Sequence, residues 1–209
     1  MITAGADLDA PATAYPSAVL VQAVNFGSGA QTANGINFAD GVINGGDPSG
    51  TTTSMFRAGS ENNGGLFPGD TGDAGLNSIL QGQAWANSGN SSKPETLRIC
   101  DLIPGQAYVA QLLASDGRSG SADRTQRYND ADDYSGSQSD SFSVQMPTYV
   151  LASFTADANG YQDIFIEDTR GSGWDTTFAG FALYSVPEPA ALSMLTIGML
   201  SLLVRRKRH

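Results

Sequence analysis

Six aspartates lie in one polar stretch of the chain, between two expected strands. Carboxylate oxygens are the ligands that Ca²⁺ prefers, and one ion takes roughly six to eight oxygens. The spacing does not match the D-x-[DN]-x-[DN]-G loop of an EF-hand. Asp130, Asp132 and Asp133 are the candidate Ca²⁺ ligands, and a solvated acidic loop is the alternative. The six residues are Asp116, Asp123, Asp130, Asp132, Asp133 and Asp140.

Aromatic residues indicate a second chemistry, the binding of sugars. Trp174, Tyr128 and Tyr134 carry flat rings of the kind that stack on sugar rings, while neighbouring polar groups bond to hydroxyls. The alternative is that these rings lie in the core or at strand ends. The three residues are the candidate ligand-binding residues, and polysaccharide is the partner that they imply.

Groups needed for common catalytic sites are missing. His209 is the single histidine, so residues 1–186 hold no base for a Ser-His-Asp triad or for a catalytic thiol. Cys100 is the single cysteine, which excludes an internal disulfide and a cysteine zinc cluster and favours a small core residue. Paired carboxylates of a glycoside hydrolase or lyase stay open as an alternative. We expect no enzyme activity and no catalytic residues.

The charge is distributed unevenly along the chain. Residues 1–186 hold seven of the eleven Lys and Arg residues and twenty of the twenty-one Asp and Glu residues, a formal net charge of −13. A surface this acidic repels the phosphates of DNA and RNA, so nucleic acid is not an expected partner. The four remaining basic residues are Arg205, Arg206, Lys207 and Arg208.

The last residues have the order of a sorting signal. Pro187 and Pro189 flank Glu188 and hold the backbone extended there. Residues 190–204 carry no charge, and as a helix they would span about 22 Å, short of the roughly 30 Å of bilayer hydrocarbon. The basic cluster that follows favours the cytoplasmic side. We therefore expect residues 187–209 to form a tail with a short membrane helix, which anchors the chain transiently or permanently.

This tail resembles the PEP-CTERM sorting signal of bacterial envelope proteins, through Pro187, Glu188, Pro189 and the basic cluster from Arg205 to Arg208. The resemblance implies recognition by an exosortase, a membrane enzyme, and delivery of the body to the cell surface or extracellular matrix. The same region is also known as an ice-binding protein C-terminal domain. This label is not evidence that the chain binds ice. Export requires a signal peptide, which we expect to be encoded upstream of Met1.

The body, residues 1–186, is expected to be an all-β, antiparallel β-sandwich of jelly-roll type. Short apolar runs recur between turn residues, and several alternate with period two. Short strands are also expected near 55–57 and 76–80. The segment from Leu102 to Tyr108 resembles a sandwich corner pinned by its tyrosine. With the closing run from Trp174 to Tyr184, the body resembles galactose-binding-like and malectin-like jelly rolls, with an immunoglobulin-like sandwich as the alternative. The main expected strands are 18–26, 95–102, 106–115, 141–146, 149–156, 161–168 and 178–185.

Together these observations predict a non-enzymatic, exported protein of the cell surface or extracellular matrix, sorted by its tail and binding polysaccharide. Two alternatives stay open at this stage. One is a carboxylate-dependent glycoside hydrolase or lyase, and the other is a purely structural envelope protein.

Overall fold

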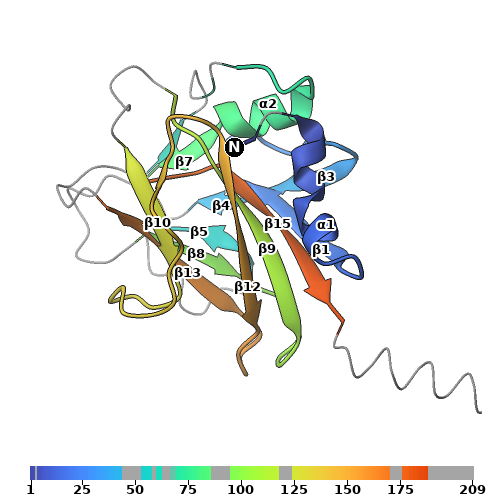
Figure 1. Cartoon of the computed structure of the whole chain (residues 1–209), viewed down its shortest axis with the longest axis vertical. Helices are drawn as coiled ribbons and strands as arrows, with labels where there is room; N and C mark the ends of the chain where they lie inside the picture. The colour runs from blue at the N-terminus through green and yellow to red at the C-terminus, as the bar shows by residue number, and fades with distance from the viewer. Residues whose placement is uncertain are drawn as a thin grey trace, which may run out of the picture.

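The computed structural model describes residues 1–2, 4–43, 53–57, 60–62, 67, 69–85, 95–117, 124–169 and 176–187. Strands dominate these residues and form two six-stranded sheets and one three-stranded sheet (Figure 1). The expected β-sandwich is therefore confirmed. No helix in this part of the chain is long and apolar enough to cross a membrane, and the expected tail helix lies outside the described residues.

The first sheet is built around β9, which pairs along its length with β12 on one side and β15 on the other. Both pairings are antiparallel, and the register of β12 against β9 is unbroken from Thr148 to Thr155. In spatial order the strands are β12 (Thr148–Thr155), β9 (Ala107–Ala114), β15 (Gly180–Val186), β1 (Val19–Asn25), β3 (Ile36–Asp40) and β2 (Gln31–Ala33).

The second sheet faces the first. Its spatial order is β11 (Phe142–Ser143), β10 (Thr125–Asn129), β13 (Gln162–Asp168), β8 (Glu95–Ile99), β5 (Met55–Phe56) and β4 (Val42–Ile43). A small sheet holds β14 (Thr177–Phe178), β7 (Gln83–Trp85) and β6 (Ser60–Asn62).

The sandwich is antiparallel except at two places. The pairs β1–β3 and β4–β5 are parallel. In the first case the cause is the chain path: β2 lies outside β3 and runs against it, so β3 returns beside β1 in the same direction.

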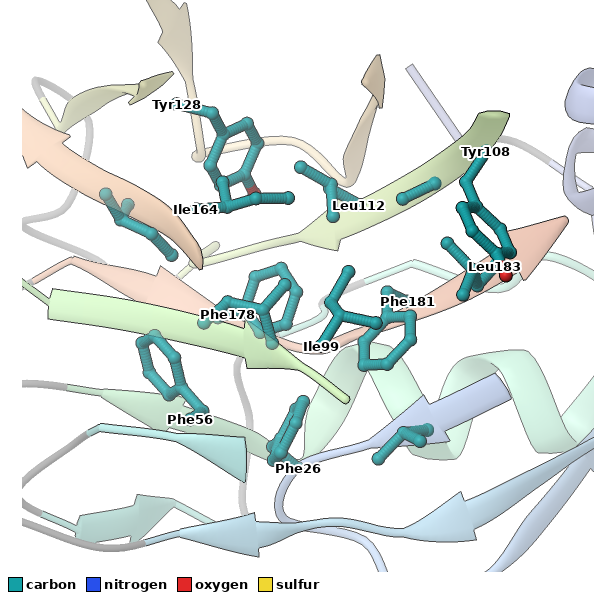
Figure 2. Close-up of a cluster of buried hydrophobic side chains, with 14 of the residues drawn as sticks. Phe26, Phe56, Ile99, Tyr108, Leu112, Tyr128, Ile164, Phe178, Phe181 and Leu183 are labelled. Atoms are coloured by element: carbon teal, nitrogen blue, oxygen red, sulfur yellow. The ribbon is translucent and has the colours of Figure 1, made fainter. Parts of the chain in front are cut away.

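A core of alternating apolar side chains fills the space between the sheets (Figure 2). Phe26, Phe56 and Phe178 are fully buried and come from the end of β1, from β5 and from β14. Their ring centroids lie 6.0 Å apart for Phe26 and Phe56, 5.6 Å for Phe26 and Phe178, and 5.3 Å for Phe56 and Phe178. One aromatic cluster thus joins elements of all three sheets.

A second core lies on the outer face of the first sheet, where three short helices cover it: η1 (Gly5–Asp9), α1 (Ala10–Ala14) and α2 (Ala74–Gln81). Leu8 and Leu76 are fully buried there against strand residues such as Val109. The sandwich therefore buries one sheet on both faces, which explains why β9 is buried over nearly its whole length.

The expected strand near residues 76–80 is wrong, because these residues belong to helix α2. The side chain of Asp73 caps the helix, its Oδ1 accepting the N–H of Leu76 at 2.8 Å. Buried Leu76, Ile79 and Leu80 follow at helical spacing. Gly75 permits the close approach of α2 to β2, since a Cβ there would lie 1.8 Å from the carbonyl oxygen of Thr32.

The tyrosine corner expected after residue 102 is present. The N–H of Ile103 donates to the hydroxyl of Tyr108 at 3.0 Å, across the turn that leads into β9. Other boundaries differ from the sequence prediction. The strand expected over 141–146 shrinks to β11, and β10 forms within the stretch expected to be an acidic loop.

We predict that Asp73→Ala lowers the free energy of unfolding by about 1–2 kcal/mol, the usual cost of a lost N-cap. Asp73 Oδ2 also accepts the N–H of Asn34 at 2.7 Å, so the change loosens the β2–β3 turn as well. Asp73→Asn keeps one side-chain oxygen for the Leu76 N–H and loses the acceptor of the Asn34 N–H. As the matched control it should therefore lose less stability than Asp73→Ala. Urea unfolding of the two variants at pH 7 measures the difference, and equal losses would contradict the capping role.

The same residue predicts a pH dependence. Hydrogen bonding, chiefly from the Leu76 N–H, holds the pKa of the Asp73 carboxyl below its usual value. A carboxylate with a depressed folded pKa stabilises the fold above its unfolded pKa of about 3.9, and this stabilisation disappears as pH falls through the folded pKa. Urea unfolding repeated below pH 4 should therefore show a smaller acid-induced loss for Asp73→Asn than for the parent chain.

Candidate functional site

A cleft of about 430 Å³ lies at the open edge of the sandwich, between edge strand β12 and the chain that follows β10. Apolar side chains from β10, β12 and β13 form much of its floor, and hydroxyl and amide groups form much of its rim. Its lining residues are Tyr128, Asn129, Asp130, Ser137, Gln138, Ser139, Val150, Leu151, Ala152, Ser153, Phe154, Thr155, Gln162 and Ile164.

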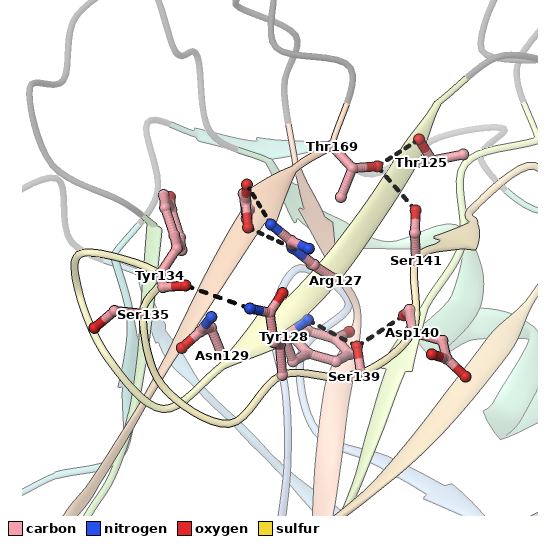
Figure 3. Close-up of polar contacts among 12 residues, drawn as sticks. Thr125, Arg127, Tyr128, Asn129, Tyr134, Ser135, Ser139, Asp140, Ser141 and Thr169 are labelled. Atoms are coloured by element: carbon pink, nitrogen blue, oxygen red, sulfur yellow. Dashed lines mark hydrogen bonds and ion pairs between the residues drawn. The ribbon is translucent and has the colours of Figure 1, made fainter.

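One wall of the cleft is fixed by bonds at the base of the loop that joins β10 to β11. The Asp130 Oδ1 atom accepts the N–H of Ser137 at 2.7 Å, and the Asp130 N–H donates to the Ser137 carbonyl at 3.2 Å. The Tyr128 N–H donates to the Ser139 hydroxyl at 3.0 Å, while the Ser139 N–H donates to the Tyr128 carbonyl at 2.9 Å (Figure 3). The polar rim is therefore held in place before any ligand arrives.

The tip of the loop is closed by its own side chains. Asp133 Oδ1 accepts both the N–H and the hydroxyl of Ser135, at 3.0 Å and 2.5 Å. The Ser135 hydroxyl is the main cause that lowers the pKa of Asp133. Tyr134 has a left-handed backbone, with φ of 58°, and its carbonyl accepts the Gln138 side-chain amide at 3.5 Å. The aspartate at the tip thus orders a turn.

Tyr128 contributes its ring to the floor of the cleft, although it is only 4% exposed. The ring packs on Phe142, with centroids 5.4 Å apart, and meets Phe178 edge-on at 6.3 Å. Burial raises the pKa of its hydroxyl well above the usual value. Tyr128 is therefore mainly a core residue, and little of its ring is available for a ligand to stack on.

Tyr134 lies on the other face of the second sheet. It sits beside the cross-strand pair in which Arg127 Nε contacts Glu167 Oε2 at 2.5 Å (Figure 3). Its pKa is raised to about 12, first by burial and then by the charges of Glu95 and Glu167. The structure therefore does not bring Tyr134 and Tyr128 together into one stacking surface. Trp174 lies outside the described residues.

Of the predicted Ca²⁺ ligands, Asp130 and Asp132 border one shallow hollow, together with Asp157 and Asp163, whereas Asp133 does not line it. Asp130 and Asp133 also bond to turns, as described above, and Asp132 is exposed. In the described ranges, no three acidic, histidine or cysteine side chains converge closely enough to hold a metal ion. Ca²⁺ binding by these aspartates stays a prediction.

Two other charged residues near this region have structural partners. Asp163 accepts two bonds from Arg98, Nε to Oδ1 at 2.6 Å and Nη2 to Oδ2 at 2.5 Å. The Arg98 guanidinium lies 4.0 Å above the ring centre of Tyr161. Asp116, the first aspartate of the polar stretch, is buried and paired with Arg124. Neither pair borders the cleft.

Among the described residues that line the cleft, Asp130 is the single carboxylate, whereas glycoside hydrolysis ordinarily needs two flanking the scissile bond. Hydroxyl and amide groups above an apolar floor suit a neutral, hydroxyl-rich ligand. Asn129, which also borders the cleft, has a buried Nδ2 atom with no hydrogen-bond partner in the described part of the chain. A buried donor of this kind is costly unless a water or ligand satisfies it.

Several cleft residues were not expected from the sequence. Gln162 of β13 and the β12 residues belong to opposite sheets, and packing of these sheets brings them to one cleft. The polar run Ser137, Gln138 and Ser139 is the one local signal that points to a hydrogen-bonding rim. Proximity between sheets is set by tertiary packing, which a single sequence does not display.

Solved structures similar to this chain support the sandwich fold. They include a calcium-binding mutant of β-glucuronidase 2 from Bacteroides uniformis, with a TM-score of 0.54 and 15% identity over 79% of this chain and 18% of that one. The ANX2 ectodomain from Arabidopsis thaliana has a TM-score of 0.53 and 10% identity, over 81% of this chain and 50% of that one. The plant receptor-like kinase FER has a TM-score of 0.50 and 12% identity, over 81% of this chain and 50% of that one.

The chain thus spans at most half the length of these solved structures. They agree with the jelly-roll body expected from the sequence and, at this identity, show the fold alone. No curated protein matches the sequence.

A protein-family comparison concerns the last residues of the chain. The PEP-CTERM protein-sorting motif matches residues 185–208, which begin within β15 at the end of the sandwich. This match covers the proline pair, the apolar run and the basic cluster described above. The chain carries a PEP-CTERM protein-sorting motif.

Proposed function

We propose that this is an exported, non-enzymatic protein of the cell surface or extracellular matrix, sorted by exosortase and binding polysaccharide in the edge cleft. The sorting motif at residues 185–208 is the observation that carries the sorting part of this function. The motif accounts for the order of an extended proline segment, an apolar run and a basic end. The motif accounts for sorting to the cell envelope, and any binding activity there belongs to the sandwich.

The cleft supports polysaccharide as the ligand. Its rim offers donors and acceptors from Ser137, Gln138, Ser139 and Gln162, and its floor is apolar. It is open at the side of the sandwich, which suits a chain that passes through better than a small molecule that must be enclosed. The described lining residues include no Lys or Arg and include Asp130, so a neutral glycan is a better match than an anionic one.

The two alternatives differ in support. A hydrolase or lyase is less favoured, because one carboxylate borders the cleft and it is bonded to the backbone of Ser137. A purely structural envelope protein needs no ligand and would leave the donor of Asn129 to a water molecule. Glycan binding separates the structural alternative from the proposed function.

Sorting should depend on the proline segment and on the basic end. In cells that contain an exosortase, we expect Glu188→Ala, or replacement of Arg205, Arg206, Lys207 and Arg208 by serine, to leave the body associated with the inner membrane. The charge change removes the positive-inside signal that orients the tail. Asp132→Ala, in an exposed loop of the body, is the control and should be sorted normally. Cell fractionation with mass spectrometry of the body measures the outcome, and normal sorting of both tail variants would contradict the proposal.

Glycan binding should depend on the rim of the cleft. We expect Gln162→Ala to weaken binding of the full chain to a neutral polysaccharide roughly three- to tenfold, the effect of one lost hydrogen bond. Gln145→Ala, an exposed glutamine outside the cleft, is the matched control. Glycan arrays followed by calorimetry measure both. Absence of binding across diverse glycans would remove the cleft from the proposed function and favour the structural alternative.

Ca²⁺ is the one cofactor that the proposal retains, with Asp130, Asp132 and Asp133 as its ligands. A bound ion stabilises the folded state by mass action, so the thermal midpoint should rise with Ca²⁺ and fall again with EDTA. Asp132→Asn should abolish the shift, while Asp70→Asn, in another exposed turn, should preserve it. A midpoint that Ca²⁺ leaves unchanged would show that these carboxylates serve only their turns and the solubility of the body.

A further inference from the structure

Large apolar side chains are exposed unevenly on the sandwich. Seven large hydrophobic residues are exposed among those that the structure describes, and four of them gather at one end. These four are Val19, Leu20, Val21 and Ile103, which are 60%, 41%, 46% and 67% exposed. Exposed apolar groups gathered in this way mark a contact with a partner or a membrane more often than chance. We call these four residues the apolar end.

Strand register places the apolar end where the chain leaves the sandwich. Val19 lies directly opposite Ser185 in the β1–β15 pair, and Tyr108 lies opposite Ser185 in the β15–β9 pair. The hydroxyl of Tyr108 accepts the N–H of Ile103 at 3.0 Å. Val19 and Leu20 therefore lie opposite the last residues of β15, and Val21 follows at the β1 bulge. Gln106 links Ile103 to Val186: its N–H donates to the Ile103 carbonyl and its side chain to the Val186 carbonyl. Figure 1 shows β15 ending at this side of the molecule.

The length of the connecting segment limits how far this end can move from the tail. Residues 187–189 separate β15 from the apolar run that begins at Ala190. Three fully extended residues span at most about 10 Å. Once the apolar run is inserted in a bilayer, the end of the sandwich that carries Val186 must stay within that distance of the interface.

We propose that the apolar end is a membrane-contacting surface that seats the sandwich on the bilayer while the tail is inserted. This inference rests on the proposed function, in which the tail enters the membrane before sorting. The partner is the lipid surface itself, because the short connection brings that surface to these side chains. Aliphatic side chains of this size partition favourably into the region between headgroups and acyl chains.

The charges at the same end select the kind of lipid. Asp101 follows β8, and the turn from Asp157 to Gly160 is bound to the neighbouring loop by the Leu102 N–H, which donates to the Gly160 carbonyl at 3.0 Å. Asp101 is exposed and Asp157 is half-buried. Two aspartates beside the contact surface oppose anionic headgroups, so seating should be favoured on zwitterionic lipid and weakened on anionic lipid.

The test uses the full chain inserted in phosphatidylcholine vesicles that carry nitroxide-labelled headgroups. In a Cys100→Ser background, a fluorophore is attached either at Ser17→Cys, beside the apolar end, or at Gln145→Cys, near the start of β12 at the opposite end of the sheet. Both native residues are exposed. We expect the headgroup nitroxides to quench the first label strongly and the second one weakly.

Replacing the four side chains by serine isolates their contribution. We expect V19S/L20S/V21S/I103S to lower quenching at the Ser17→Cys label about threefold or more, because each aliphatic group lost weakens the partition into the interface. The matched control is V42S/M146S, which removes two exposed apolar side chains outside the apolar end and should leave quenching unchanged. Ile103→Ser alone, in a turn, is a second variant that keeps strand β1 intact and should lower quenching in the same direction.

Flotation of the vesicles separates the two levels of the inference. A parent chain that does not float would overturn tail insertion, and with it the proposed sorting and this inference. A chain that floats normally, with equal quenching in parent, serine and control variants, would leave tail insertion intact and overturn only the contact surface. Stronger quenching on phosphatidylglycerol than on phosphatidylcholine would also contradict it, because the aspartates at this end should be repelled.

Discussion

The contact among Phe26, Phe56 and Phe178 is the constraint on which the rest of the structure depends. Each ring comes from a different sheet element and none is exposed to solvent, so the cluster fixes the position of all three sheets at once. Burial of one such ring contributes about 1.5–3 kcal/mol. Tyr128 extends the cluster, meeting Phe178 edge-on, and carries it to the floor of the cleft. The cluster thus extends from the core between the sheets to the cleft beside β12.

Strands with one buried face could be predicted because their pattern is local. In β13, Ile164 and Ile166 face the core while Asp163 and Glu167 face outward. This alternation can be recognised in the sequence without knowing which strands lie beside β13. Helix α2 was missed although its signals are also local: Asp73 as the cap and Leu76, Ile79 and Leu80 at helical spacing. The surrounding run of glycine and asparagine suggested loops and short strands, and it obscured a periodicity of only two turns.

Strand β10 was missed for a different reason, because one of its inward residues is polar. Gln126 is 2% exposed, and its side chain acts as a substitute for a neighbouring strand. Its amide donates to the carbonyl of Thr177 at 3.0 Å, and its oxygen accepts the N–H of Thr177 at 3.1 Å. Because this inward position holds a glutamine, whose amide is hydrogen-bonded to the backbone of β14, the sequence of β10 lacks the apolar alternation that indicates a strand. The core position of Tyr128, which the sequence left open as the alternative to sugar stacking, followed from this strand.

The candidate site shows the same limit more sharply. The acidic stretch was recognised from composition, yet composition could not show that Asp130 and Asp133 would bond to turns, since each partner is fixed by the shape of the loop. The two tyrosines were treated as one stacking set, although Tyr128 belongs to the strand and Tyr134 to the loop that folds back over its opposite face. Which face a side chain occupies depends on strand register, and one residue of error reverses it.

The position of the cleft relative to the end of β15 bears on how ligand binding and sorting are related. The cleft runs along the free edge of β12, whereas the sorting tail leaves from the end of β15, two strands away across β9. Thr155, at one end of the cleft, is nevertheless level with Val186, because both lie opposite Ala107 of β9. The cleft therefore reaches the end of the sheet from which the tail leaves. Release of the body from its tail would change neither β12 nor the loop base at Asp130 and Ser137. The cleft would then keep the same lining at the membrane and in the matrix.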